Sequence, residues 1–241
     1  MNDRFEAYIS QVSSLSPVEL IAFFLDRHPG KVALSSSLGA EDQVLTHMLA
    51  GSGKPFKLFT LDTGRLFQEC YDLIEITKQR YQLPFEVYFP EAAHVEKMVN
   101  EKGVNLFYDS VENRKLCCHI RKIEPLRRAL AGMEVWITGV RREQSGTRGD
   151  VGLLELDTDL GLIKVNPLVD WKEEDVWAFI KEHKVPYNTM HDKGYPSIGC
   201  LPCTRAILPG EDIRAGRWWW EDPALKECGL HLPHPAKRPL N

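Results

Sequence analysis

The chain has 241 residues and a mass of 27.5 kDa, enough to bury a hydrophobic core in one large domain or two small ones. Hydrophobic residues make up 43% and charged residues 27% of the chain, which excludes a disordered, collagen-like or coiled-coil protein. Thirty basic and 34 acidic residues give a net charge of −4, which argues against a nucleic-acid-binding surface. Because we find neither a membrane-spanning apolar run nor a secretory signal pattern, we expect a cytoplasmic protein without membrane contact.

The first part of the chain predicts helices and then a strand. Ser16 is a candidate N-cap, with a proline next to it and Glu19 three residues further on. Apolar residues over 20–25 supply a buried face for that helix. Residues 31–34 have the pattern of a short buried strand, which runs into a serine-rich segment at 35–39.

Strand and helix patterns alternate through the rest of the chain. We expect strands at 56–61, 85–88, 135–139 and 162–165, helices over about 40–49 and 66–81, helical stretches to about 101, and a helix capped by Asp170. Helices of ten or more residues between strands indicate a mostly parallel sheet with helical crossovers. Glycine, proline and cysteine dominate from about residue 190, so we predict an α/β domain over 1–190 and an integrated, loop-rich C-terminal segment over 191–241.

Three segments at predicted strand ends are candidates for binding a ligand, since ligands of parallel sheets bind beyond the carboxyl ends of the strands. The serine loop, residues 35–39, offers hydroxyls and backbone N–H groups to a phosphate, although a simple helix cap is the commoner role of such a turn. The aspartate loop, residues 61–64, can line the same crevice or be an ordinary turn with a glycine at positive φ. Arg141 and Arg142 can grip phosphate or sulfate, although Glu143 can instead pair with one of them.

The cysteines form the most specific pattern. Cys117 and Cys118 are adjacent in a predicted helix, and Cys200 and Cys203 stand in a Cys-x-x-Cys loop. Because cytosolic thiols are kept reduced, metal binding or thiol chemistry explains them better than disulfides do. Four thiolates hold either zinc or an iron–sulfur cluster. Adjacent helical cysteines point about 100° apart, which favours the larger four-iron cluster, while a vicinal disulfide would leave the second pair unexplained.

The two remaining cysteines have different surroundings. Cys228 stands near His231 in a glycine- and proline-containing tail, the setting of a low-pKa nucleophile; a harmless exposed thiol is the alternative. Cys70 lies in a helix with an apolar face, so we expect a small core residue.

Together these motifs resemble the iron–sulfur assimilatory adenylyl-sulfate (APS) reductases of the PAPS/APS reductase family. The resemblance covers about residues 15–232 and rests on the two cysteine pairs, the Glu227-Cys228-Gly229-Leu230-His231 tail, the serine and aspartate loops, and the segments 117–122, 138–142 and 214–219. It implies an adenine-nucleotide α-hydrolase-like (Rossmann-like) fold with helices on both faces of the sheet. The implied reaction converts APS and reduced thioredoxin to sulfite, AMP and oxidised thioredoxin, in assimilatory sulfate reduction and cysteine biosynthesis. Related ATP pyrophosphatases carry two glycines in the loop that here is rich in serine, which argues against ATP hydrolysis.

The resemblance also implies a role for each candidate residue. Cys228 would attack the sulfate sulfur of APS, expel AMP and form a thiosulfonate, which thioredoxin would then resolve. The implied catalytic residues are Cys228, His231, Lys122, Arg214 and Arg217; the substrate-binding residues are Ser35, Ser36, Ser37, Gly39, Leu61, Asp62, Thr63, Gly64, Arg141 and Arg142; and the ligands of one 4Fe-4S cluster are Cys117, Cys118, Cys200 and Cys203.

Other functions remain open at this point. A PAPS reductase, or an enzyme that uses both nucleotides, is the nearest alternative, although typical members of that type lack both cysteine pairs. A metal-stapled tRNA-thiolation protein would need a basic face, and a structural zinc protein would leave Cys228 without a purpose. The sequence is compatible with a homo-oligomer but does not fix the oligomeric state.

Overall fold

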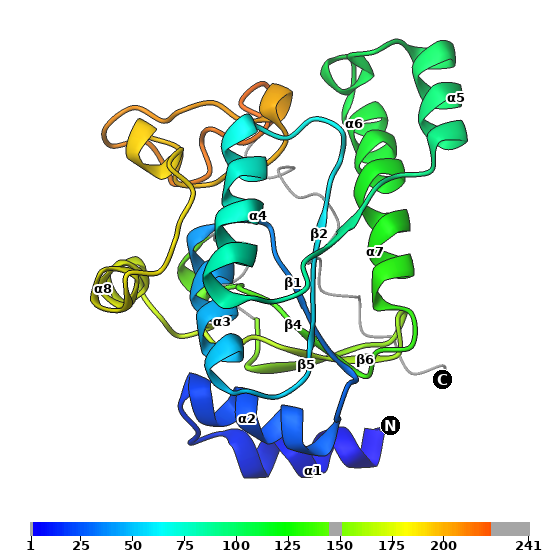
Figure 1. Cartoon of the computed structure of the whole chain (residues 1–241). Helices are drawn as coiled ribbons and strands as arrows, with labels where there is room; N and C mark the ends of the chain where they lie inside the picture. Colours follow the sequence, from blue (N-terminus) through cyan, green and yellow to red (C-terminus); the bar gives the residue numbers. More distant parts are fainter. Residues whose placement is uncertain (1, 145–150, 223–241) are drawn as a thin grey trace.

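A six-stranded sheet forms the centre of the computed structural model, which describes residues 2–144 and 151–222 (Figure 1). The strands are β1 (Val32–Ser35), β2 (Lys57–Leu61), β3 (Glu86–Tyr88), β4 (Val135–Ile137), β5 (Leu154–Asp157) and β6 (Leu162–Val165). They lie in the order β3-β2-β1-β4-β6-β5, and every neighbouring pair is parallel except β5 with β6. The predicted mostly parallel sheet is therefore confirmed.

Helices cover both faces of this sheet (Figure 1). The α-helices are α1 (Asn2–Val12), α2 (Pro17–Arg27), α3 (Ala40–Gly51), α4 (Gln68–Tyr81), α5 (Ala92–Lys102), α6 (Val111–Cys118), α7 (Glu124–Leu130) and α8 (Glu173–His183). Short 3₁₀ helices span Leu106–Tyr108, Arg142–Gln144, His191–Lys193 and Leu201–Cys203, and a π-helix spans His119–Ile123. None of the helices within the described ranges is long and apolar enough to cross a membrane.

Alternating side chains of the strands build two separate cores. Val32 and Leu34 of β1 pack in the larger core, which α2, α3, α4 and α8 complete. Ala33, between them, faces the opposite side and packs with Trp136 of β4 and Leu126 of α7. This alternation follows from the two-residue period of a strand, and it makes each central strand apolar on both faces.

Local sequence signals account for where several elements begin. Ser16 caps α2 as predicted: its Oγ accepts from the Glu19 N–H at 3.4 Å, while the Glu19 carboxylate accepts from the Ser16 N–H at 2.8 Å. Asp170 was predicted to cap α8, and this is wrong, because the N-cap is Lys172, whose N–H donates to Asp175. Asp170 instead forms an ion pair with Arg142.

The hairpin of β5 and β6 is the main element that the sequence pattern did not reveal. We predicted β6, but β5 carries both apolar and acidic residues and lies antiparallel at the edge of the sheet. The division of the chain at residue 190 stays a prediction.

The sheet order changes direction between β1 and β4, because the chain continues on one side to β2 and on the other to β6. Crevices at such switch points bind ligands in open α/β sheets.

Candidate functional site

A cavity of about 1050 Å³ lies at the switch point, beside the carboxyl ends of β1, β2 and β4. We call it the main cavity. Ten of the predicted catalytic and substrate-binding residues line it: Ser35, Ser36, Ser37, Gly39, Leu61, Thr63, Lys122, Arg141, Arg214 and Arg217. The sheet therefore gathers loops that are more than 150 residues apart in sequence, since the carboxyl ends of parallel strands meet at one edge.

The three hydroxyls of the serine loop differ in what they can offer a ligand. The Ser35 Oγ accepts a hydrogen bond from the Trp136 indole N–H at 2.7 Å, and the Ser36 Oγ accepts from the Leu38 N–H at 3.2 Å. Both hydroxyls keep their own hydrogen for a ligand oxygen. The Ser37 Oγ instead donates to the Asp42 carboxylate at 2.6 Å, so its hydrogen is already used.

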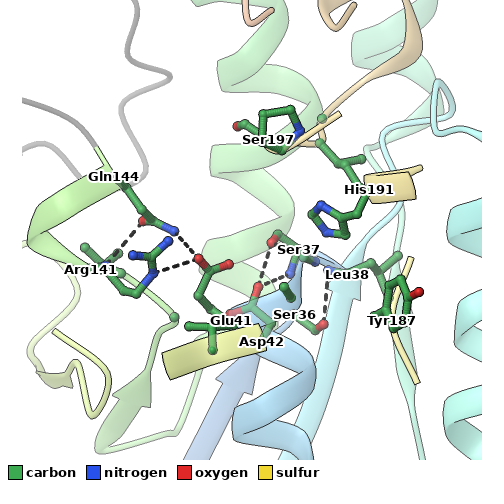
Figure 2. Close-up of a pocket in the computed structure, with 18 of the residues that line it drawn as sticks. Ser36, Ser37, Leu38, Glu41, Asp42, Arg141, Gln144, Tyr187, His191 and Ser197 are labelled. Atoms are coloured by element: carbon green, nitrogen blue, oxygen red, sulfur yellow. Dashed lines mark hydrogen bonds and ion pairs between the residues drawn. The ribbon is translucent and has the colours of Figure 1, made fainter. Parts of the chain in front are cut away.

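Two acidic residues in the first turn of α3 hold the loops around the main cavity in place (Figure 2). Glu41 accepts from the Arg141 Nε at 2.8 Å and from the Gln144 amide at 2.9 Å. Asp42 is buried, and this burial raises the pKa of its carboxyl to about 6, while hydrogen bonds from Ser37 and Gly139 oppose the shift. Neither acid was among our predicted site residues.

Arg141 and Arg142 point to different places. Arg141 is almost fully buried and lines the main cavity, where its guanidinium pairs with Glu41 and, at 2.9 Å, with Glu143. Arg142 donates its Nε to the Val151 carbonyl and pairs with Asp170, and it does not line the main cavity. We therefore leave Arg142 out of the residues that we propose to contact substrate.

The aspartate loop links the main cavity to the cysteines. The Asp62 carboxylate accepts from the Gly64 N–H at 2.7 Å, and Gly64 has a φ of +70°, a conformation that glycine adopts without strain. Asp62 and Gly64 thus shape the turn, and neither lines the main cavity. Thr63 does line it, and its Oγ1 lies 3.2 Å from the Cys200 Sγ.

Arg214 and Arg217 reach the main cavity from the C-terminal segment. The Arg217 guanidinium is buried, donates to the Ile198 carbonyl at 3.1 Å, and lies 4.8 Å from the centre of the Trp218 ring. Its Nε is buried and has no hydrogen-bond partner in the part of the chain that the structure describes. A buried cation with an unused donor is suited to receive an anionic group.

All four cysteines of the two predicted pairs line a second, small cavity of about 20 Å³, the cysteine cavity. Each of these thiols is at most 9% exposed, so the fold brings the two distant pairs together in a buried cluster with Phe107 and Trp218. Within residues 2–144 and 151–222, no three or more His, Cys, Asp or Glu side chains are arranged to hold a metal ion. Among the described residues, the four thiols therefore line one cavity without forming a preformed single-ion site.

Basic side chains complete the wall of the cysteine cavity. They are Arg65, Arg114, Arg121 and Lys122. The Arg121 Nη1 donates to the Thr63 carbonyl at 2.6 Å. Burial raises the pKa of the Cys117 thiol, and the nearby positive charge of Arg121 opposes this increase. Burial also raises the pKa of Cys203 to about 12. Such buried thiols are poor nucleophiles at neutral pH, and each would have to lose its proton to bind a metal.

The π-helix at 119–123 explains how one helical segment serves both cavities. It follows Cys118 directly and inserts between α6 and α7, and such insertions are frequent at functional sites. Lys122 in the π-helix lines both the main cavity and the cysteine cavity, as does Cys200 on the opposite wall. The two cavities are thus neighbours that share walls.

Two predicted catalytic residues, Cys228 and His231, lie outside the residues that the structure describes. Conversely, sequence reasoning missed Glu41, Asp42 and Arg121, which hold the loops of the site. Glu41 and Asp42 follow the serine loop directly and Arg121 precedes Lys122, so closeness to a motif was a signal for each of them.

Comparison with known proteins agrees with this architecture. At the level of fold, the chain is similar to an FMN adenylyltransferase of Candida glabrata (TM-score 0.54, 15% identity, covering 78% of this chain and 65% of that one), a structure that also contains FAD and pyrophosphate. A PAPS reductase of Candida auris, solved with phosphate, is more similar (TM-score 0.73, 28% identity, covering 85% of this chain and 98% of that one). The predicted α/β nucleotide-binding fold is confirmed.

The family follows from the sequence comparison. Residues 31–206 match the model of the phosphoadenosine phosphosulfate reductase domain, and the chain belongs to this family. It is 53% identical over 212 residues to the adenosine 5′-phosphosulfate reductase of Allochromatium vinosum, covering 88% of this chain and 83% of the relative. It is 52% identical over 222 residues to the enzyme of the same name from Burkholderia cepacia, covering 92% and 88%.

Proposed function

We propose that this protein reduces adenosine 5′-phosphosulfate to sulfite and AMP in sulfate assimilation, with thioredoxin as electron donor. The observation that carries the proposal is the main cavity at the switch point, which joins the serine loop to the cations Lys122, Arg214 and Arg217. Relatives about half identical to this chain bear the name of that activity, which supports the same substrate here. The cytoplasm is the proposed location.

The substrate would place its two anionic groups among the donors of the main cavity. Ser35 and Ser36 would offer their hydroxyl hydrogens to the phosphate, and the aspartate loop, through Leu61 and Thr63, would lie beside the adenosine. Lys122, Arg214 and Arg217 would take the sulfate and the charge that shifts during the reaction. Arg141 is already paired with two carboxylates, so its role is to support the wall rather than to supply a free positive charge.

Two steps of sulfur chemistry would follow. The Cys228 thiolate attacks the sulfate sulfur, the sulfur–oxygen bond to the phosphate breaks, and AMP leaves with that electron pair, so that Cys228 carries an S-sulfo group. A thioredoxin thiolate then attacks the Cys228 sulfur and expels sulfite; the second thioredoxin thiol resolves the mixed disulfide and restores the Cys228 thiolate. His231 would assist near Cys228. Because the first step joins two anions, it depends on fixed cations such as Arg217.

The donor set around the cysteine cavity supports the 4Fe-4S cluster that we propose as cofactor. Its sulfur donors are the four thiols of Cys117, Cys118, Cys200 and Cys203, a set that iron–sulfur clusters use. The basic side chains in its wall would offset the negative charge of four thiolates. When bound, the cluster would hold the α6 helix and the 200–203 loop together beside the active site. The proposed roles of Cys228, His231 and these four ligands rest on the resemblance and on this donor set.

The direct test is sulfite release from APS and from PAPS by anaerobically prepared protein with reduced thioredoxin. We expect sulfite and AMP in equal amounts from APS and much slower release from PAPS. Incubation with APS alone should add the mass of one SO₃ group to the protein. Faster turnover of PAPS would instead identify a PAPS reductase, the nearest alternative, and release from neither nucleotide would refute the proposed function.

A further inference from the structure

Asp42 connects two loops that belong to neighbouring strands. The serine loop follows β1, and Gly139 lies two residues beyond the end of β4, which is paired with β1 in the sheet. The Asp42 carboxylate accepts from both the N–H and the Oγ–H of Ser37, each at 2.6 Å (Figure 2), and also from the main chain of Gly139. One buried side chain thus accepts two hydrogen bonds from the serine loop and contacts the main chain of the Gly139 loop.

The approach of Gly139 to this carboxylate is unusually close. A Cβ atom at residue 139 would lie 2.4 Å from the Asp42 Oδ1 and 2.9 Å from the Glu41 Cβ, so only a glycine fits there. The glycine in the Thr138-Gly139-Val140-Arg141 motif is therefore explained by Asp42 rather than by a turn. Gly139 is thus held against α3, next to Thr138, which lines the main cavity.

The serine loop also needs an external restraint. Leu38 is a non-glycine residue at φ +65°, a strained conformation that persists only where the surroundings enforce it. Its buried side chain and the bond from its N–H to the Ser36 Oγ hold one end. The two bonds from Ser37 to Asp42 hold the middle of the loop.

We propose that Asp42 is a positioning residue, whose ionised carboxylate fixes the serine loop and the Gly139 loop in the one geometry that binds the nucleotide. This inference rests on the proposed function for the identity of the ligand. It goes beyond that function because Asp42 does not take part in the chemistry and acts only through Ser37 and Gly139.

The burial of a charge at this place has a cost in stability. The pKa of Asp42 is raised to about 6 by burial, and the like charge of Glu41 adds to the shift. The other charged or titratable groups around the pair are Arg141 and Glu143, which pair with each other, and His191, whose side chain interacts with Glu41. A group whose folded pKa lies above its unfolded value destabilises the fold at neutral pH, and this loss is recovered as the pH falls through 6 toward 4.

This gives a test that separates positioning from ordinary structural support. The Asp42→Asn substitution keeps the shape of the side chain but leaves one acceptor oxygen, and the new NH₂ group would face a donor. We expect the holoenzyme of Asp42→Asn to raise the KM for APS and the Kd for AMP at least tenfold. We also expect its melting temperature at pH 7.5 to equal or exceed that of the wild type, because the buried charge is gone, and this advantage to shrink at pH 5.

Three comparisons complete the experiment. Ser37→Ala should weaken AMP binding by a smaller factor, and adding it to Asp42→Asn should cause little further loss, since both weaken the contact between residues 37 and 42. Asp26→Asn, which changes an exposed carboxylate on α2, should match the wild type. An Asp42→Asn variant with wild-type KM and Kd, or one whose melting temperature falls at pH 7.5 in step with its binding, would overturn the inference.

The proposed function fails separately, namely if the wild type releases no sulfite from APS. The AMP-binding and melting measurements would still judge Asp42 in that case, because they do not depend on turnover.

Discussion

Gly199→Ala is expected to disable the enzyme by moving one guanidinium group without removing any charge. Gly199 lies beneath the side chain of Arg217: a Cβ at residue 199 would be 2.4 Å from the Nη2, 2.5 Å from the Cζ and 3.0 Å from the Nη1. Ordinary contact begins at 3.4 Å, so the guanidinium would have to withdraw by about 1 Å. Its bond to the Ile198 carbonyl, 3.1 Å long, would break or bend as it does so.

The size of the effect follows from the role that we propose for Arg217. A misplacement of about 1 Å in a group that stabilises the transition state can cost about 10² in rate, which corresponds to about 2.7 kcal/mol. Removal of the same charge in Arg217→Ala should lower the rate by about 10²–10³. The rate of Gly199→Ala should therefore fall almost as far as that of Arg217→Ala.

The assay is sulfite release from APS at saturating thioredoxin, with the visible spectrum of each variant as a check of the cysteine cavity. Gly51→Ala is the matched control, since a Cβ at residue 51 meets nothing within 4 Å. We expect Gly51→Ala to behave as the wild type. If Gly199→Ala turns over within twofold of the wild type, the position of Arg217 does not matter and the reasoning fails. If Gly199→Ala does not fold, the role of Arg217 is decided by the turnover of Arg217→Ala, provided that this variant keeps the visible spectrum of the wild type.

Cys228→Ser should keep the visible spectrum and bind APS but release no sulfite, because a hydroxyl is a far weaker nucleophile than a thiolate; substantial turnover would show that another group attacks. The four proposed cluster ligands are Cys117, Cys118, Cys200 and Cys203. Serine in place of any one of them should weaken or abolish the absorption near ~400 nm, whereas Cys70→Ser should retain it. Stoichiometric zinc without iron in the protein would contradict the proposed cofactor. Arg114→Met should lower the free energy of unfolding by about 3–5 kcal/mol in denaturant titrations, because it leaves the buried Glu221 carboxylate, now 2.7 Å from the Arg114 Nη2, without its cation. The double variant Arg114→Met/Glu221→Gln, in which neither charge stays buried without a partner, should cost less than Arg114→Met alone, and an equal loss would speak against an uncompensated charge as the cause.

The elements with strong local signals could be predicted from the sequence. The capping box at Ser16 and Glu19 placed the start of α2 correctly, and short runs rich in apolar residues placed the central strands β1, β2 and β4. By contrast, β5 lies at the edge of the sheet and is half-buried, and the alternation of apolar and acidic residues over its four positions is too short to mark a strand on its own. The cap of α8 was misassigned because Asp170 and Lys172 both precede the helix, and only the position of Arg142 draws Asp170 away.

The chemistry of the site could be predicted from residue types and their spacing, because the two cysteine pairs, the serine loop and the basic residues each lie in a short segment of the sequence. The sequence alone thereby determined the family, the parallel-sheet fold and ten of the residues that line the main cavity. Only the tertiary structure decided which side chains already have a partner within the protein. Arg141 pairs with Glu41, a hundred residues before it, and the Ser37 hydroxyl donates to the buried Asp42 carboxylate. The union of the two cysteine pairs around one cavity, with Lys122 in the wall that it shares with the main cavity, likewise arises from long-range packing, which no local pattern encodes.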